Sequence, residues 1–206
     1  MSIFTELAKK PWLVDPAEGD SLPPRAAAFF VPAGKVGLRV FLTVVTVVFT
    51  LMIIAYTHRM LYANWRPMPE PWLLWLNTAI LLAASLAMQW AKNNAGRDNL
   101  GGVRDGLLWG GVLTFAFLAG QLYVWQQLVD LGYYAASSTA NAFFYLLTAI
   151  HGLHMLGGLI AWGRSFLKML RGSTVTELRL SVELCTTYWH YLLLVWFVLF
   201  AMLLIS

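Results

Sequence analysis

The 206-residue sequence contains few charged residues. Asp, Glu, Lys and Arg together make up 12% of the chain, whereas soluble domains average about 25%. Hydrophobic residues make up 59%, and the mean hydropathy is +0.65. This composition excludes a soluble globular domain and indicates an integral membrane protein.

Cysteine and the common catalytic motifs are also scarce. Cys185 is the single cysteine, so no disulfide framework can form and the redox compartment cannot be inferred. The chain has no phosphate-binding glycine loop, serine nucleophile motif or Cys-x-x-Cys pair. Catalysis by this chain alone therefore has little support, and we expect no catalytic centre on it.

Long apolar runs dominate what is present. About 20 apolar residues span a bilayer as a helix, and five such runs can be identified at 37–56, 72–91, 107–129, 141–162 and 180–205. All are too long for strands, and none alternates apolar with polar residues, which excludes a barrel. The sequence therefore predicts an all-α integral membrane bundle of five transmembrane helices, covering 36–206.

The segment 1–35 differs from the rest. It mixes charges with several prolines, a composition that opposes regular structure, and we expect a polar cytoplasmic tail. A cleavable signal peptide would need an early apolar core. The first long apolar run begins only after Lys35, so we expect the N-terminus to be retained.

The basic residues predict the orientation in the membrane. All but Arg59 and Arg66 of the 14 Lys and Arg residues lie in the tail, the second loop and the fourth loop, on one side of the predicted bundle. Loops rich in Lys and Arg stay in the cytoplasm. We therefore expect the N-terminus inside and the C-terminus outside. The same bias explains the net charge of +4 without a nucleic-acid partner.

Ionisable side chains inside the last two runs are the candidate functional residues. His151 and His154 lie in the fourth run and His190 in the fifth, and Glu183 precedes His190 by about two helical turns on the same face. Placing such groups inside a bilayer costs free energy, so their presence there indicates a structural or functional role. Because the two runs are joined by a short loop, we expect antiparallel neighbours in which His154 faces His190.

Three interpretations of this cluster remain open. The favoured one is a hydrogen-bonded polar network that also includes Thr148 and Tyr188 and fixes the register of the helices. A metal or haem site is the second, although His151 and His154 diverge by about 60° around a helix. A proton relay is the third, but no continuous polar chain reaches the outer face.

Four segments resemble a known family. Residues 145–157 (YLLTAIHGLHMLG) and 183–196 (ELCTTYWHYLLLVW) are similar to signature segments of subunit III of the haem-copper terminal oxidases. Residues 76–91 and 120–125 resemble the second and third core helices of that family. The resemblance covers all five runs and excludes the tail, and the length is similar to the short, five-helix bacterial form.

The resemblance implies an accessory subunit without redox centres. Such a subunit packs beside catalytic subunit I, together with subunit II, in a proton-pumping respiratory oxidase of the bacterial inner membrane. The complex oxidises cytochrome c or quinol and reduces oxygen to water. Haem and copper would lie in the partner subunits, with none on this chain.

For the candidate residues, the resemblance implies a structural role beside bound phospholipid. It places His151, His154, Glu183 and His190 in an interhelical polar network beside a lipid cleft, with no metal. The alternatives are a self-standing metal- or haem-binding membrane enzyme that uses this cluster, and an accessory subunit of a nitric oxide reductase.

The sequence departs from the family at three carboxylates. No acidic residue lies between Arg39 and His58, and Val124 and Leu193 stand where the family usually has acidic residues. These replacements argue against a role for subunit III carboxylates in proton collection in this protein, and they indicate a divergent branch.

Overall fold

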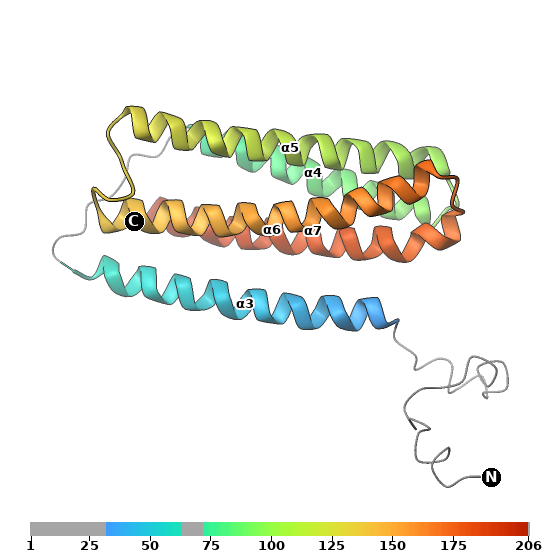
Figure 1. Ribbon diagram of the computed structural model, residues 1–206, viewed down its shortest axis with the longest axis horizontal. Helices are drawn as coiled ribbons and strands as arrows, with labels where there is room; N and C mark the ends of the chain where they lie inside the picture. The colour runs from blue at the N-terminus through green and yellow to red at the C-terminus, as the bar shows by residue number, and fades with distance from the viewer. Residues whose placement is uncertain (1–31, 63–71, 206) are drawn as a thin grey trace, which may run out of the picture. The chain divides into compact units, whose positions relative to one another are not determined.

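Each predicted span forms a helix. The computed structural model describes residues 32–62 and 72–205. In that part the elements are all helical, and five helices are long and apolar enough to cross a membrane. They are α3 (Ala33–Met60), α4 (Leu73–Ala95), α5 (Leu100–Asp130), α6 (Thr139–Leu170) and α7 (Val175–Ile205) (Figure 1). The all-α, five-helix prediction is confirmed, whereas the predicted tail lies outside the described residues up to position 31.

The helices extend beyond the apolar runs where charged residues follow. α5 begins at Leu100 rather than at 107 and includes Arg104, and α6 continues past 162 to Leu170 and includes Lys168. Both basic side chains are exposed. Hydropathy marks only the part of a helix that crosses hydrocarbon, and the backbone remains helical in the more polar layer beyond it.

Side-chain caps define the starts of α5 and α6, and glycine residues define their ends. The side chains of Asn99 and Ser138 accept hydrogen bonds from the backbone amides of Gly102 and Asn141 at the starts of α5 and α6. Both helices end in a left-handed glycine, Gly132 (φ 85°) and Gly172 (φ 83°). The paired backbone bonds around these two glycines are those of the Schellman motif. The chain therefore reverses within a few residues, so successive helices run antiparallel.

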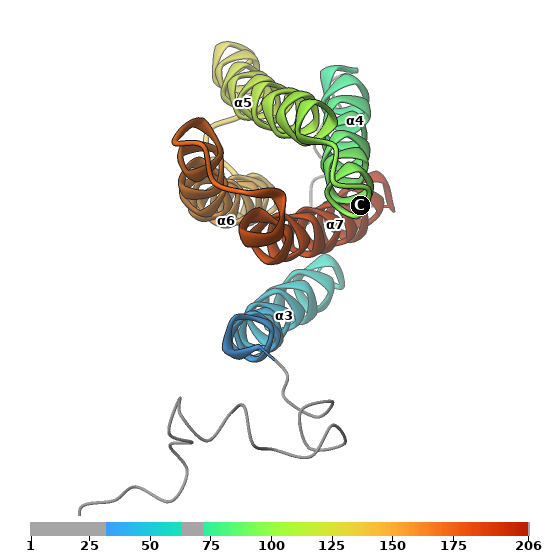
Figure 2. The same cartoon turned by 90° about the vertical axis from the view of Figure 1, so that its right-hand side faces the viewer.

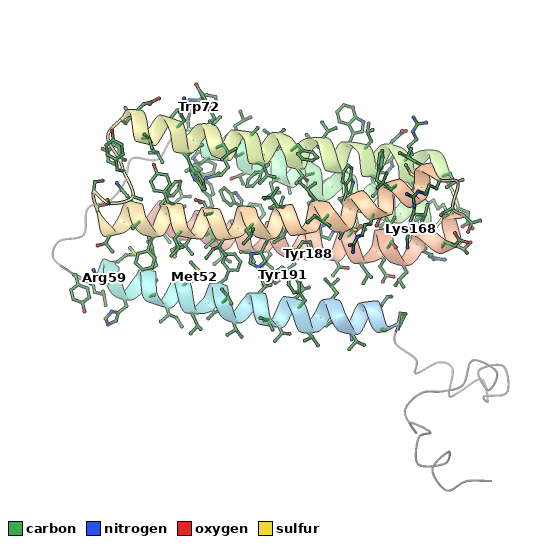
Figure 3. The ribbon with its side chains drawn as sticks, in the orientation of Figure 1. Met52, Arg59, Trp72, Lys168, Tyr188 and Tyr191 are labelled. Atoms are coloured by element: carbon green, nitrogen blue, oxygen red, sulfur yellow. The ribbon has the colours of Figure 1, made fainter. Side chains whose placement is uncertain are left out.

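Four helices form a ring. α4 contacts α5 and α7, and α6 contacts the same two helices, an arrangement visible end-on in Figure 2. The part of α3 from Leu38 onward packs outside this ring against α6 and α7, where Val45, Phe49 and Tyr56 form a cluster with Leu147 and Leu199. Figure 3 shows Tyr188 and Tyr191 of α7 between α7 and α3.

The contact between α4 and α5 depends on glycine. Gly102, Gly106 and Gly110 follow one another on one face of α5 and lie against Asn94, Ala91 and Met88 of α4. A Cβ atom on Gly106 would lie 2.7 Å from the Cβ of Ala91. Small residues at this spacing let two membrane helices approach closely.

Candidate functional site

His151 lies in the centre of the bundle. Its side chain is 1% exposed and is surrounded by the rings of Trp196, Phe117 and Phe49, at centroid distances of 5.3, 6.0 and 6.4 Å. Neither ring nitrogen has a hydrogen-bond partner among the described residues. The contacts of His151 are thus packing contacts with aromatic rings from three other helices.

His154 is directed toward α3. Its Nδ1 lies 2.8 Å from the backbone oxygen of Ile150, one turn earlier in the same helix, and its ring packs 5.5 Å from that of Phe49. The hydroxyl of Tyr188 donates to the backbone oxygen of His154 at 2.8 Å. The polar link between α6 and α7 at this level is therefore made by Tyr188 and a backbone carbonyl.

His190 is directed toward α4. Its Nδ1 is hydrogen-bonded to the hydroxyl of Ser85, and its Nε2 lies 2.9 Å from Oε1 of Gln89. The expectation that His154 faces His190 is therefore wrong. α7 contacts both α4 and α6, and His190 lies on the face that meets α4.

Glu183 is the fourth candidate residue, and its surroundings bear on the metal interpretation. Glu183 is half-buried on α7, and its backbone oxygen accepts a hydrogen bond from Thr187 at 2.9 Å. Within residues 32–62 and 72–205, no group of three or more His, Cys, Asp and Glu side chains is arranged to hold a metal ion. Thus His151 and His154 share a ring contact with Phe49 of α3, whereas His190 is hydrogen-bonded to α4.

Tryptophan and threonine make interhelical bonds, and of these residues the sequence interpretation named only Thr148. Nε1 of Trp189 donates to Thr114 at 2.9 Å, linking α7 to α5. Trp196 donates in the same way to Thr78 of α4, and Trp125 of α5 donates to Thr148 of α6. A sequence signal existed, because Trp189 and Trp196 share one helical face and each threonine lies within an apolar run.

Each threonine hydroxyl in these pairs both donates and accepts a hydrogen bond. The hydroxyl of Thr114 donates to the backbone oxygen of Gly110 at 2.7 Å, and the hydroxyls of Thr78 and Thr148 donate to their own helices at the same distance. The free lone pair of each oxygen then accepts the indole N–H. Within hydrocarbon, such bonds satisfy both partners and fix the register of neighbouring helices.

The positions of the missing carboxylates lie in packed surroundings. Val124 is completely buried in the main core, and Leu193 packs against the same core. The apolar side chains of Val124 and Leu193 fill space between helices. The replacement of the family's carboxylates by valine and leucine is therefore consistent with the packing.

An apolar groove opens between α5 and α6. Its volume is about 310 Å³, and its walls include Leu118, Leu122 and Trp125 of α5 and Ala149, Gly152 and Leu153 of α6. None of the four predicted site residues lines it. The groove lies along the membrane-spanning part of both helices.

Comparison with known proteins points to one family. Residues 12–205 match the family model for cytochrome c oxidase subunit III. The probable cytochrome c oxidase subunit 3 of Mycobacterium tuberculosis is 32% identical over 145 residues, which cover 68% of this chain and 70% of the relative. Cytochrome c oxidase subunit 3 of Thermostichus vulcanus is 27% identical over 172 residues, covering 81% and 84%. That of Drosophila yakuba is 29% identical over 125 residues, covering 61% and 47%.

These matches agree with the fold. The region matched by the family extends over all five helices, and the relatives come from bacteria and from an animal. A self-standing metal- or haem-binding enzyme is not favoured by them. The chain is a multi-pass membrane protein and belongs to the cytochrome c oxidase subunit III family, whose members are accessory subunits of the multi-subunit haem-copper oxidases.

Proposed function

We propose that this chain is the accessory, non-redox subunit III of a proton-pumping respiratory oxidase in a bacterial inner membrane. The complex oxidises cytochrome c or quinol and reduces oxygen to water. The observation that carries this proposal is the family match over residues 12–205, which includes every described helix.

The partners are catalytic subunit I and subunit II, which hold the haem and copper. This chain holds neither, in keeping with a family whose subunits III are generally free of cofactors. Its role is to stabilise the catalytic subunit during turnover. The predicted residues His151, His154 and His190 then serve the packing and assembly of the helices rather than the chemistry.

The N-terminus lies in the cytoplasm, and phospholipid binds to the bundle. The α4–α5 and α6–α7 loops lie at one end of the bundle (Figure 1), and these loops and their flanking turns carry most of the basic residues outside the tail, which supports placing that end inside. The apolar groove between α5 and α6 supports phospholipid binding, because an acyl chain can fill it with hydrocarbon contacts.

Deletion of the chain from its oxidase tests this function. We expect the haem content and the initial rate of oxygen consumption to remain close to those of the intact complex, because the redox centres lie elsewhere. Activity should be lost sooner during prolonged turnover, and restoring the chain should reverse the effect. Identical decay of activity with and without the chain would contradict the proposal.

A further inference from the structure

His190 lies at the middle of a membrane helix and yet is exposed. α7 runs from Val175 to Ile205, so His190 lies about 22 Å from either end at 1.5 Å per residue. The hydrocarbon layer is about 30 Å thick, which places this imidazole inside it. Ionisable side chains at such depths almost always face protein or water rather than lipid. The surface around His190 therefore requires a cover other than acyl chains.

A chain of hydrogen bonds leads from His190 along α4. Nε2 of Gln89 donates to Oδ1 of Asn93 at 3.0 Å, which leaves Oε1 of Gln89 to accept from Nε2 of His190. Nδ1 of His190 is then the acceptor of the hydroxyl of Ser85. We call Ser85, Gln89, Asn93 and His190 the α4/α7 polar seam.

The polar seam keeps unused hydrogen-bonding capacity. Each side-chain amide has two N–H donors and an oxygen with two lone pairs. The bond between Gln89 and Asn93 uses one donor of Gln89 and one lone pair of Asn93, and the bond from His190 uses one lone pair of Gln89. Asn93 is exposed and Gln89 is half-buried, so this capacity is within reach of a neighbouring molecule at the surface of the bundle.

The outer face of α3 behaves differently. Two of its exposed threonines, Thr43 and Thr57, donate their hydroxyls to backbone oxygens of their own helix at 3.0 Å, and the same helix exposes Val40, Val44 and Leu51. These two hydroxyls need no further partner, and the exposed apolar side chains of this helix suit lipid. The polar seam does not, because acyl chains offer neither donors nor acceptors.

We propose that the α4/α7 polar seam is the surface on which this chain docks against a transmembrane helix of the catalytic subunit. The inference rests on the proposed function. Leu86 of α4 and Leu194 of α7, each 60% exposed, flank the seam and supply the apolar part of the contact. The partner helix presents a polar side chain to Gln89 and Asn93, since interhelical hydrogen bonds of this kind join membrane helices.

Photo-crosslinking in the intact membrane tests this surface. A benzophenone amino acid replaces Leu86 or Leu194 in the full chain, and Leu51 of α3, which is 61% exposed, serves as the matched control. All three side chains point away from the core, so the fold is retained. We expect adducts with the haem-containing catalytic polypeptide from positions 86 and 194 and none from position 51. Adducts from position 51 alone would overturn the proposal.

A substitution provides the second measurement. Gln89→Leu removes the amide together with its bonds to His190 and Asn93 and preserves the bond between Ser85 and His190, and Thr43→Leu is the control on α3. After mild solubilisation, Gln89→Leu should retain about three- to tenfold less haem polypeptide per chain than the wild type, as expected for the loss of an interhelical hydrogen bond. Thr43→Leu should retain the wild-type amount.

The outcomes separate the two proposals. If the wild-type chain brings no haem polypeptide with it, the proposed function fails, and this inference fails with it. If the wild type and Gln89→Leu retain equal amounts, the chain is still a subunit of the oxidase, but the polar seam is not where it docks.

Discussion

Trp189 and His151 illustrate how single side chains differ in what they contribute to this bundle. Both are buried, with exposures of 0% and 1%. The indole N–H of Trp189 donates to Thr114 on another helix at 2.9 Å, whereas both nitrogens of His151 lack a partner among the described residues. A buried polar group stabilises a fold when it is hydrogen-bonded and costs free energy when it is not.

Replacing these two residues should have different consequences for stability. Trp189→Phe removes the interhelical bond and part of a buried ring, and we expect it to lower the stability of the solubilised complex by about 1 to 2 kcal/mol. His151→Leu fills a similar volume and loses no hydrogen bond, so stability should remain the same or rise slightly. The measurement is the thermal transition of each complex.

An exposed tryptophan provides the control for this comparison. Trp109→Phe alters a side chain that is 55% exposed and should leave the thermal transition unchanged. A larger loss of stability from His151→Leu than from Trp189→Phe would show that the imidazole, rather than the indole, joins the helices.

At the scale of the element, the close contact between α4 and α5 depends on the absence of a side chain at Gly106 of α5. Gly106 has no side chain where Ala91 of α4 approaches, and an added Cβ would also lie 2.7 Å from the backbone nitrogen of Ala91. A backbone atom cannot move aside as a flexible side chain can, so the helices themselves would have to separate.

The matched variants Gly106→Ala and Gly157→Ala test this contact. Gly106→Ala should destabilise the complex by about 1 to 3 kcal/mol, the usual cost of overpacking. Gly157 lies mid-helix in α6 with no neighbouring atom within 4 Å of an added Cβ, so Gly157→Ala should be neutral. The thermal transition measures both, and equal values for the two variants would contradict close packing at Gly106.

How well the sequence predicts the five helices and their ends depends on whether its residues carry a signal for each feature. Hydropathy located all five helices, because apolar length is what the bilayer demands. It placed their charged ends several residues too far inward, as at Leu100 of α5 and Leu170 of α6, since a helix continues in the interfacial layer without apolar side chains. The Schellman ends at Gly132 and Gly172 were not predicted from the sequence.

The candidate site was harder to predict because α7 has more than one neighbour. Tyr188 and His190 are separated by about 200° around the helix, and the first bonds to α6 whereas the second bonds to α4. Sequence spacing gives the angle between two residues of one helix but not the helix that each of them meets. The assumption that consecutive helices share their polar residues therefore paired His190 with the wrong partner.

For the whole molecule, the distribution of charge along the bundle sets the orientation that we propose. The α6–α7 loop is flanked by Lys168, Arg171 and Arg179, whereas the α5–α6 loop at the opposite end contains no basic residue between Asp130 and Asn141. Positively charged loops resist transfer across the membrane during insertion. The two loops are therefore expected on opposite sides, with the basic one in the cytoplasm.

Cysteine labelling in intact cells tests this orientation. Ala135 of the α5–α6 loop and Thr174 of the α6–α7 loop are both exposed, and Cys185 is buried, so it gives little background. A membrane-impermeant maleimide should label Ala135→Cys in intact cells and Thr174→Cys only after the membrane is opened. The reverse pattern would place the basic loop outside, and the N-terminus of α3 with it, because helices α3 to α7 cross the membrane in alternating directions.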